Sequence, residues 1–499
     1  MNRAFRNRKE RYAIHTLVWV VSLISLMFLV WWRFIYAIES PRSWDQVDFT
    51  LALDRFDLFA MQPHFPGYPY FILGGIWLNK WIFNPAEALA TWNSLLMLLA
   101  IYPMYRISRS FLSKTFSIVA VSLIQSMVFV NVLTVQPMSE ASAVAILWWY
   151  MWSLQQGFIK HSTVWIVISS FFFSLLLGVR LSYLPFGIGF VLLLIYQKNK
   201  FTTKEYLSFL MMQVLVAVVF QFIWVGGLAV SEGGVAAFLQ LALGFSEGHF
   251  EEWGGTAVSA STSFFERLSH LFLNNIGWTG IGGQNLFVLL LLIALLVYLT
   301  MVRVKKPIRI TEVSWFGWAF VSMIFSYFLW ALFAQNIDKP RHILPLPGMV
   351  LLGFLWCGLK KQCDGSKRML LLLAVIISVQ SAVSYTTMKE ANDPAAVYQL
   401  IDYLEDETEP LIVYTWEETR VMSFNRVSFE HEQIYTYSSF LADLRYYDNH
   451  RVYLTEQVVE GFAKQGIPIE DQVKRVQTFH SSPLYDPVYH DIVLYEFQQ

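Results

Sequence analysis

Long apolar runs constrain this chain more than any other feature of its sequence. A bilayer core of roughly 30 Å is crossed by a helix of about 20 apolar residues, and many runs reach that length in a chain that is 56% hydrophobic. Their hydropathy predicts eleven spans, near residues 14–36, 87–105, 115–135, 139–157, 163–179, 182–197, 206–228, 284–303, 314–334, 343–360 and 369–387. We therefore expect an all-α polytopic membrane domain.

Basic residues gather in alternate loops of this topology. They precede the first span and follow the second, fourth, sixth, eighth and tenth, which the positive-inside rule assigns to the cytoplasm. The N-terminus is then cytoplasmic, and the opposite side carries loops 37–86, 229–283 and 335–342 and the tail. Residues 68–83 are apolar but interrupted by glycines and a lysine, which predicts a short interfacial or re-entrant helix.

The tail differs from the rest in being acidic, polar and free of apolar spans. Its periodicity predicts helices near 396–407, 438–447 and 455–465 and strands near 411–416, 451–454, 473–479 and 491–497. Two domains are expected: a transmembrane domain at 1–387 and a small extracytoplasmic α/β domain at 388–499.

Composition also excludes some partners. The net charge is −1 and no basic stripe is present to neutralise phosphates, so nucleic acid is not an expected partner. The two cysteines, Cys357 and Cys363, are too few for a disulfide framework or a metal cluster.

The first outer loop carries four carboxylates directly after an apolar span. Asp45 and Asp48 are three residues apart, on one face of a helix that begins here. Asp54 and Asp57 alternate with apolar residues as in an interfacial amphipathic helix, so we interpret them as its solvated side. Asp45, at the join of span and loop, is the candidate for chemistry, with Asp48 second. His64 opens a stiff His-Phe-Pro-Gly-Tyr-Pro turn and either donates to an anion or is structural.

Further ionisable residues stand at the outer ends of other spans. Glu140 opens the fourth span and is a candidate acceptor or lid residue. Arg180 lies between the fifth and sixth spans, and Arg341 and His342 precede the tenth. Each alone is compatible with a snorkelling anchor, whereas ionisable groups within a span indicate a functional site. Because these residues and the aspartates lie on the same predicted side of the membrane, the pattern favours one shared anionic pocket.

A glycine-rich stretch at 244–255 contains further candidates, Glu247, His249 and Trp253. It is either a mobile lid over a pocket or a structured cap without a direct role. The spacing of its histidine and acids fits no zinc template, so no metal is expected.

These motifs, in this order, resemble the GT-C class of integral-membrane glycosyltransferases, in particular relatives of protein O-mannosyltransferases and of the lipid A aminoarabinose transferase. The resemblance covers roughly residues 14–387. It rests on WDQVDF at 44–49, AL at 52–53, FD at 56–57, QPHFPGYP at 62–69, MSE at 138–140, GVR at 178–180, LP at 184–185 and PRHILP at 340–345.

The resemblance implies a polyprenyl-phosphate-linked sugar donor, inversion at the anomeric carbon and an acidic catalytic base in the first outer loop. Carried over, Asp45 is that base, and Arg180, Arg341 and His342 bind the donor phosphate. Several relatives have Asp-Glu where this chain has Asp45-Gln46, and the usual His-Pro-Pro turn reads His-Phe-Pro here, which leaves the acceptor open.

The acceptor could be a protein, a lipid or a glycan, and neither the sugar nor the length of the lipid carrier follows from the sequence. Two alternatives stay open. One is a transporter or flippase of lipid-linked sugars, which the clustering of charges at one interface disfavours. The other is a non-catalytic relative whose tail binds partners.

Overall fold

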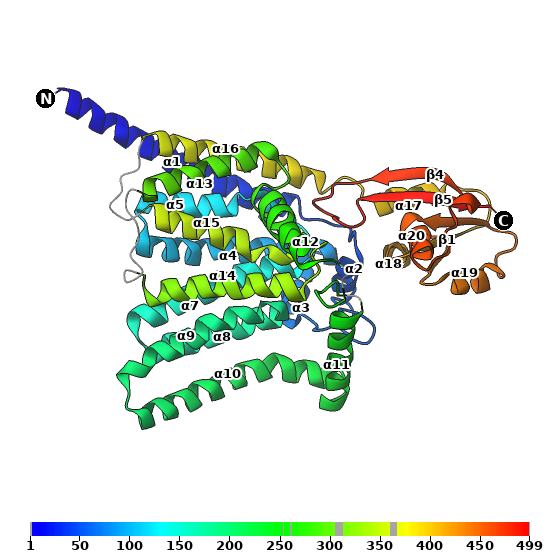
Figure 1. Ribbon diagram of the computed structural model, residues 1–499, viewed down its shortest axis with the longest axis horizontal. Coiled ribbons are helices and arrows are strands. Elements are labelled where there is room, and N and C mark those ends of the chain that lie inside the picture. The colour runs from blue at the N-terminus through cyan, green and yellow to red at the C-terminus, as the bar shows by residue number, and fades with distance from the viewer. Residues whose placement is uncertain (1, 253, 260–261, 305–312, 360–366, 499) are drawn as a thin grey trace.

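The protein is a bundle of long helices with a small sheet domain at one end (Figure 1). This computed structural model describes all residues except 1, 253, 260–261, 305–312, 360–366 and 499. The bundle comprises α1 (Asn2–Ile35), α2 (Trp44–Leu51), α3 (Pro69–Asn79), α4 (Pro85–Phe111), α5 (Lys114–Gln125), α6 (Val128–Thr134), α7 (Ser139–Lys160), α8 (Thr163–Val179), η1 (Leu181–Gly187), α9 (Ile188–Gln197), η2 (Lys198–Lys200), α10 (Thr203–Ser231), α11 (Val235–Glu251), α12 (Phe264–Ser269), η3 (His270–Ile281), α13 (Leu286–Val304), α14 (Trp315–Ala334), η5 (Pro340–Ile343), α15 (Pro345–Gly358) and α16 (Lys367–Glu390).

Among the described residues, 7 helices are long and apolar enough to cross a membrane, or up to 9 if each bent pair is one span. The bent pairs are α5 with α6 and the α12–η3 segment with α13. The protein is thus a multi-pass membrane protein. The sequence predicts eleven spans, which is more than the 9 counted in this way. The two remaining predicted spans correspond to α7 and α8. The helix α7 is long enough but less apolar than the others, and α8 is apolar but has only 17 residues.

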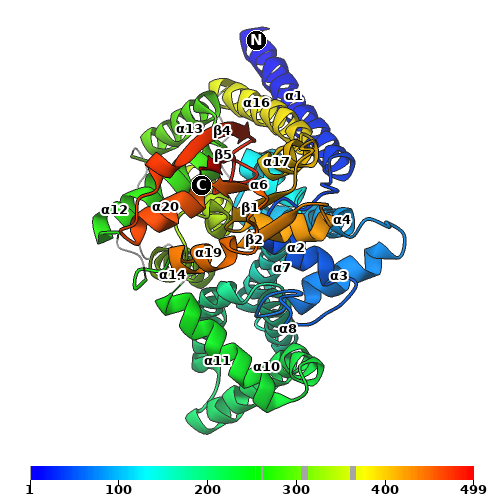
Figure 2. The same cartoon turned by 90° about the vertical axis from the view of Figure 1, so that its right-hand side faces the viewer.

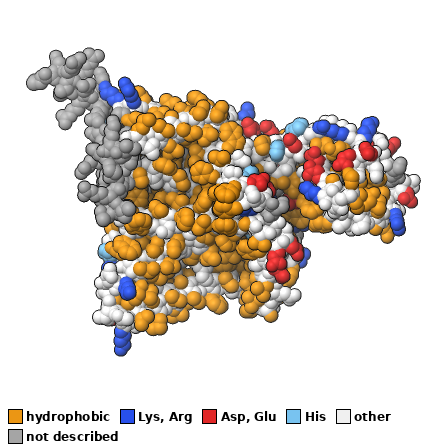
Figure 3. Space-filling view, in the orientation of Figure 1, with side chains coloured by type: hydrophobic (Ala, Val, Ile, Leu, Met, Phe, Trp, Pro, Cys, Tyr) orange, Lys and Arg blue, Asp and Glu red, His pale blue; other side chains and the backbone are white. Residues whose placement is uncertain are grey.

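The polarity of α7 follows from its place in the bundle. It packs against α4, α8 and α9, and almost all of its side chains are buried in protein. A helix that meets other helices instead of lipid can carry serines and glutamines that bond internally. Hydrophobic side chains cover the visible face of the bundle, whereas charged ones gather near its junction with the sheet domain (Figure 3).

The loop at 37–86 holds two short helices, as expected, but the first ends early. The predicted amphipathic helix continues to Leu58, whereas α2 ends at Leu51. The chain then turns, and Asp57 and Gln62 form an isolated antiparallel β-bridge. The apolar segment at 68–83 is helical over α3, which follows a turn with Gly67 at φ +89°.

The C-terminal domain is a five-stranded sheet with helices. It contains α17 (Ala396–Glu405), β1 (Leu411–Thr415), α18 (Glu418–Asn425), β2 (Glu430–Gln433), α19 (Tyr437–Leu444), β3 (Arg451–Thr455), α20 (Glu456–Lys464), η6 (Glu470–Gln472), β4 (Val473–His480) and β5 (Asp491–Phe497). The strand order is β2-β1-β3-β5-β4, with β1 parallel to β2 and β3, and β5 antiparallel to β3 and β4. All seven predicted elements are present. The sequence missed α18 and β2, because the Glu-His-Glu-Gln edge strand has no apolar alternation.

The domain is joined to the bundle next to α2. Val47 of α2 belongs to the same buried apolar cluster as Leu400 and Val413 of the domain. The Tyr398 hydroxyl donates to the Pro41 carbonyl (2.9 Å), and the Arg42 guanidinium donates to the carbonyl of Asp393 (2.9 Å). Seen from the domain's end, α10 and α11 lie to one side of it (Figure 2).

Candidate active site

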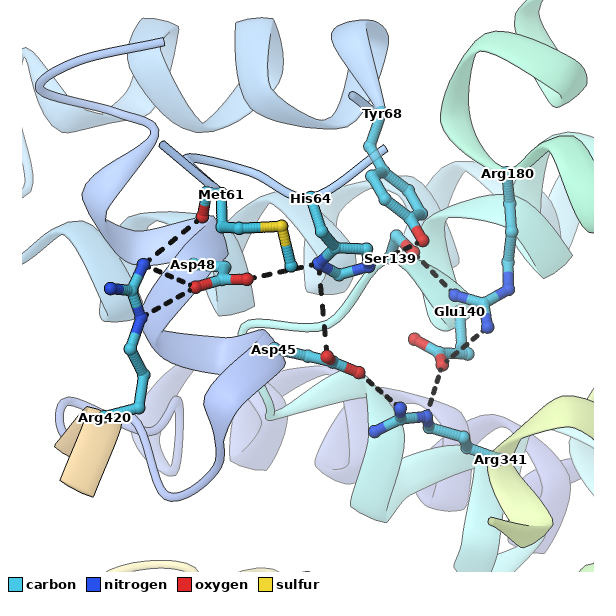
Figure 4. A network of polar contacts seen from close by, with 10 residues as sticks. All are labelled: Asp45, Asp48, Met61, His64, Tyr68, Ser139, Glu140, Arg180, Arg341 and Arg420. Carbon is cyan, nitrogen blue, oxygen red and sulfur yellow. Dashed lines mark hydrogen bonds and ion pairs between the residues drawn. The ribbon is translucent and has the colours of Figure 1, made fainter. Parts of the chain in front are cut away.

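Residues from six separate segments meet at the end of the bundle that faces the sheet domain (Figure 4). They come from α2, the turn before α3, the start of α7, the end of α8, η5 and α18. The start of α7 is fixed by Asn93 of α4, whose side-chain amide donates to the Gln136 and Met138 carbonyls (2.9 and 2.7 Å). Its amide oxygen accepts from the Ser142 N–H (3.1 Å). These buried hydrogen bonds position the first residues of α7.

Glu140 lies at the centre of the site, between two arginines. Its carboxylate is completely buried, 3.1 Å from Arg180 Nη2 and 3.3 Å from Arg341 Nε. The sequence grouped Glu140 with the acceptor or lid residues, whereas the structure makes it the shared counter-ion of both guanidinium groups. Arg180 also donates to Ser139 Oγ (2.9 Å) and contacts His342 Nδ1 (3.1 Å). Since a guanidinium only donates, His342 accepts here and orients Arg180.

Asp45 joins this group through Arg341, whose Nη2 donates to Asp45 Oδ2. Burial raises the pKa of Asp45, but the opposing charges of Arg341 and His64 outweigh it and hold that pKa well below its usual range. The Asp45 side chain is 25% exposed. It therefore combines a defined orientation with access to a reactant.

Asp48, also on α2, is completely buried. Arg420 of α18 donates to its Oδ1 through Nε (2.9 Å) and Nη2 (2.7 Å). His64 Nδ1 is 3.4 Å from Asp48 Oδ2 and 4.0 Å from Asp45 Oδ1, and its Nε2 is 2.9 Å from the Tyr68 hydroxyl. Burial raises the pKa of Asp48, against the lowering effect of His64 and Arg420.

Asp54 and Asp57 lie outside this network. Asp54 is exposed, and Asp57 accepts from the Ala60 N–H (3.1 Å) and pairs with Arg55. Both carboxylates serve the local turn and the solvent.

The glycine-rich stretch is largely helical, since α11 continues to Glu251. Glu247 is exposed, His249 Nε2 is 3.0 Å from the Ala334 carbonyl, and Trp253 lies outside the described residues. The ring of Phe245 on α11 stacks 6.4 Å from that of His64. This helix therefore covers the turn that carries His64. In the described parts of the chain no three His, Cys, Asp or Glu side chains are grouped so as to hold a metal ion.

A small cavity separates the bundle from the sheet domain beside Asp45. Its volume is about 40 Å³, which is room for a few waters. Lys339 and Arg341 line it from the bundle, and Glu417 and Tyr489 line it from the domain. Lys339 makes no ion pair with any described residue, but it shares this cavity with the carboxylates of Asp45, Glu417 and Asp486.

The sequence missed two of these positively charged residues. Lys339 directly precedes the Pro-Arg-His motif, so its position beside Arg341 was the available signal. Arg420 offered none, because 372 residues separate it from Asp48.

No known protein family profile and no curated protein sequence matches this chain. Solved structures do match it. The Archaeoglobus fulgidus oligosaccharyltransferase is 12% identical with a TM-score of 0.51, over 88% of this chain and 69% of that one. The chain has a GT-C fold. ArnT from Cupriavidus metallidurans, bound to undecaprenyl phosphate, is 10% identical with a TM-score of 0.49, over 96% and 98% of the two chains. The mycobacterial arabinofuranosyltransferase AftD is 13% identical with a TM-score of 0.40, over 97% and 40%. The GT-C expectation for the architecture is thus confirmed.

Proposed function

We propose that this protein is a membrane glycosyltransferase that moves a sugar from a polyprenyl-phosphate-linked donor to an acceptor hydroxyl, with inversion. The observation that carries the proposal is the meeting of Asp45 with Arg341, Glu140 and Arg180 beside a lysine. A carboxylate that can accept a proton there stands next to cations that can accept a phosphate. The resemblance of the motifs and the GT-C fold support the same chemistry.

The acceptor hydroxyl requires a general base, and Asp45 has the exposure and position for that role. Its carboxylate takes the hydroxyl proton as the acceptor oxygen bonds to the anomeric carbon. The bond between that carbon and the phosphate oxygen breaks, and its electron pair leaves with the phosphate. A single displacement of this kind inverts the anomeric centre.

The departing phosphate gains negative charge, which fixed cations stabilise without reorganisation. Arg341 and Lys339 line the cavity next to the base, and Arg180 supports Arg341 through their shared Glu140. ArnT binds undecaprenyl phosphate, and we propose a donor on a carrier of this class. The protein's own residues orient the reactants, neutralise the charge that develops on the phosphate and accept the proton of the acceptor hydroxyl.

The charge pattern of the loops supports a cytoplasmic N-terminus, with the site and the domain at 388–499 on the outer face. The acceptor then belongs to the cell envelope, as a glycan, a lipid or a protein. The charged side chains of the site form one compact network (Figure 4) that Arg420 joins to the C-terminal domain, which favours a transferase over a transport path through the membrane.

Asp45→Asn tests the proposal, with Asp54→Asn as the matched control on the same loop. Purified full-length protein is given a panel of synthetic undecaprenyl-phosphate-linked hexoses and pentoses, with a membrane fraction as the acceptor source. We expect Asp45→Asn to slow the release of undecaprenyl phosphate about 10²- to 10⁴-fold, the usual contribution of a general base. Release at the wild-type rate by Asp45→Asn would refute the assignment of the base.

A further inference from the structure

Arg420 joins the C-terminal domain to the loop that carries the proposed base. Arg420 extends from α18 to the first outer loop, where its guanidinium donates twice to Asp48 and once to the Met61 carbonyl (3.4 Å) (Figure 4). Its Cζ lies 5.4 Å from the centre of the Trp44 ring, within cation–π range. Arg420 therefore holds three points of the loop that carries the proposed base.

Asp48 needs this partner. A completely buried carboxylate is costly unless cations or hydrogen-bond donors compensate for the water that it has lost. Arg420 occupies Oδ1, and the imidazole of His64 lies next to Oδ2. Without Arg420, His64 would be the one partner left to the Asp48 carboxylate among the described residues.

Asp48 is linked in turn to Asp45. Both stand on the same face of the eight-residue helix α2, and His64 Nδ1 lies between their carboxylates, at 3.4 and 4.0 Å. The far nitrogen of His64 is held by Tyr68. A shift of Asp48 or of its charge would therefore act on His64 and on the orientation of α2, both of which contact the base.

We propose that Arg420 is a positioning residue of the active site, so that the C-terminal domain completes the catalytic centre through Asp48 and His64. The inference rests on the proposed function, because it assumes that Asp45 is the base. Arg420 touches neither Arg180, Arg341 nor Lys339. Its removal accordingly acts on the chemical step and leaves the binding of the donor phosphate intact.

The test compares Arg420→Ala, Arg420→Lys and the control Arg445→Ala in purified full-length protein. Arg445 is exposed at the end of α19 and makes no ion pair in the described part of the domain. A displacement of the base by about 1 Å costs up to about 10²-fold in rate. We expect Arg420→Ala to lower kcat for the release of undecaprenyl phosphate by about tenfold to a hundredfold, with the KM of the donor within about twofold of wild type. Arg420→Lys should recover part of kcat, since a lysine restores the charge but not the two-nitrogen contact.

A double-mutant cycle separates positioning from a general loss of structure. If Arg420 acts through Asp48, adding Arg420→Ala to Asp48→Asn lowers kcat no further, whereas independent effects multiply. Multiplying effects, or a wild-type kcat in Arg420→Ala, would overturn the inference. The Asp45→Asn variant keeps the two proposals distinct: if it is inactive while the cycle multiplies, only the role of Arg420 fails. If Asp45→Asn is fully active, the proposed function itself fails.

Discussion

Replacing Glu140 by glutamine separates the two arginines from the anion that they share. Glutamine keeps the shape of the side chain but removes its charge. Arg180 and Arg341 have side chains only 8% and 18% exposed, at 3.1 and 3.3 Å from the Glu140 carboxylate. In the variant, Asp45 is the carboxylate that still pairs with Arg341 among the described residues, and Arg180 has lost its ion-pair partner.

The distances set the size of the effect. At an effective dielectric constant of about 20, each contact of this length has a Coulomb energy of about 5 kcal/mol, from which the cost of dehydrating the charges is subtracted. Removing one partner of a buried ion pair typically costs about 3–5 kcal/mol. We expect the free energy of unfolding of Glu140→Gln to fall by about this amount in the absence of substrate.

A phosphate that binds beside the arginines would replace the missing charge. If it recovers as little as ~1.4 kcal/mol of the loss, the variant binds a lipid phosphate about tenfold more tightly than the wild type does. Glu140→Gln is therefore expected to have a lower melting temperature on its own and a larger rise in melting temperature when undecaprenyl phosphate is added.

The assay is thermal unfolding of purified protein in detergent over a series of undecaprenyl phosphate concentrations. Glu39→Gln is the control, an exposed glutamate between α1 and α2 without an ion pair among the described residues. A Glu140→Gln variant that melts at the wild-type temperature and binds the lipid no more tightly than the wild type would refute the role of Glu140 as the counter-ion shared by Arg180 and Arg341.

Two further predictions concern stability. A Cβ added at Gly74 would lie 2.1 Å from Cε2 of Trp92, so Gly74→Ala should lower the free energy of unfolding by about 1–3 kcal/mol or more. Gly227→Ala on α10, where a Cβ meets nothing within 4 Å, should leave the melting temperature unchanged. In the C-terminal domain, burial raises the pKa of Glu418 from its usual 4.5 to about 7, so the folded state favours the protonated carboxyl and loses stability as pH rises through that window. Glu418→Gln should remove this loss, a gain of about 3 kcal/mol near pH 8 and little near pH 5, measured by thermal unfolding at both values.

The sequence was sufficient where a pattern is local. Apolar runs placed a helix or helix pair at every predicted span, and alternation placed seven elements of the tail. Asp45, Glu140, Arg180 and Arg341 could be grouped from the sequence because all four lie on the same predicted side of the membrane, at or near the ends of spans. The structure brings these four into one network.

The sequence was not sufficient to predict features that depend on tertiary contacts. α2 ends at Leu51 although the apolar pattern continues, because the chain turns to bring His64 back toward Asp48. No local pattern relates Arg420 to Asp48, since their contact depends on how a separate domain docks on α2.

The charges of the site fit the order of the proposed reaction. Asp45 and Glu140 pair with Arg180 and Arg341, while Lys339 shares the cavity with Glu417 and Asp486 and makes no ion pair with a described residue. A sugar phosphodiester carries one negative charge, and in the proposed reaction its phosphate binds beside Arg341 and Lys339. Because Arg341 also holds Asp45, a phosphate that takes up donors of Arg341 would weaken that pair and make the carboxylate more basic. In the proposed reaction the base is thus activated when the donor is bound, which limits proton transfer to a site that is ready to use it.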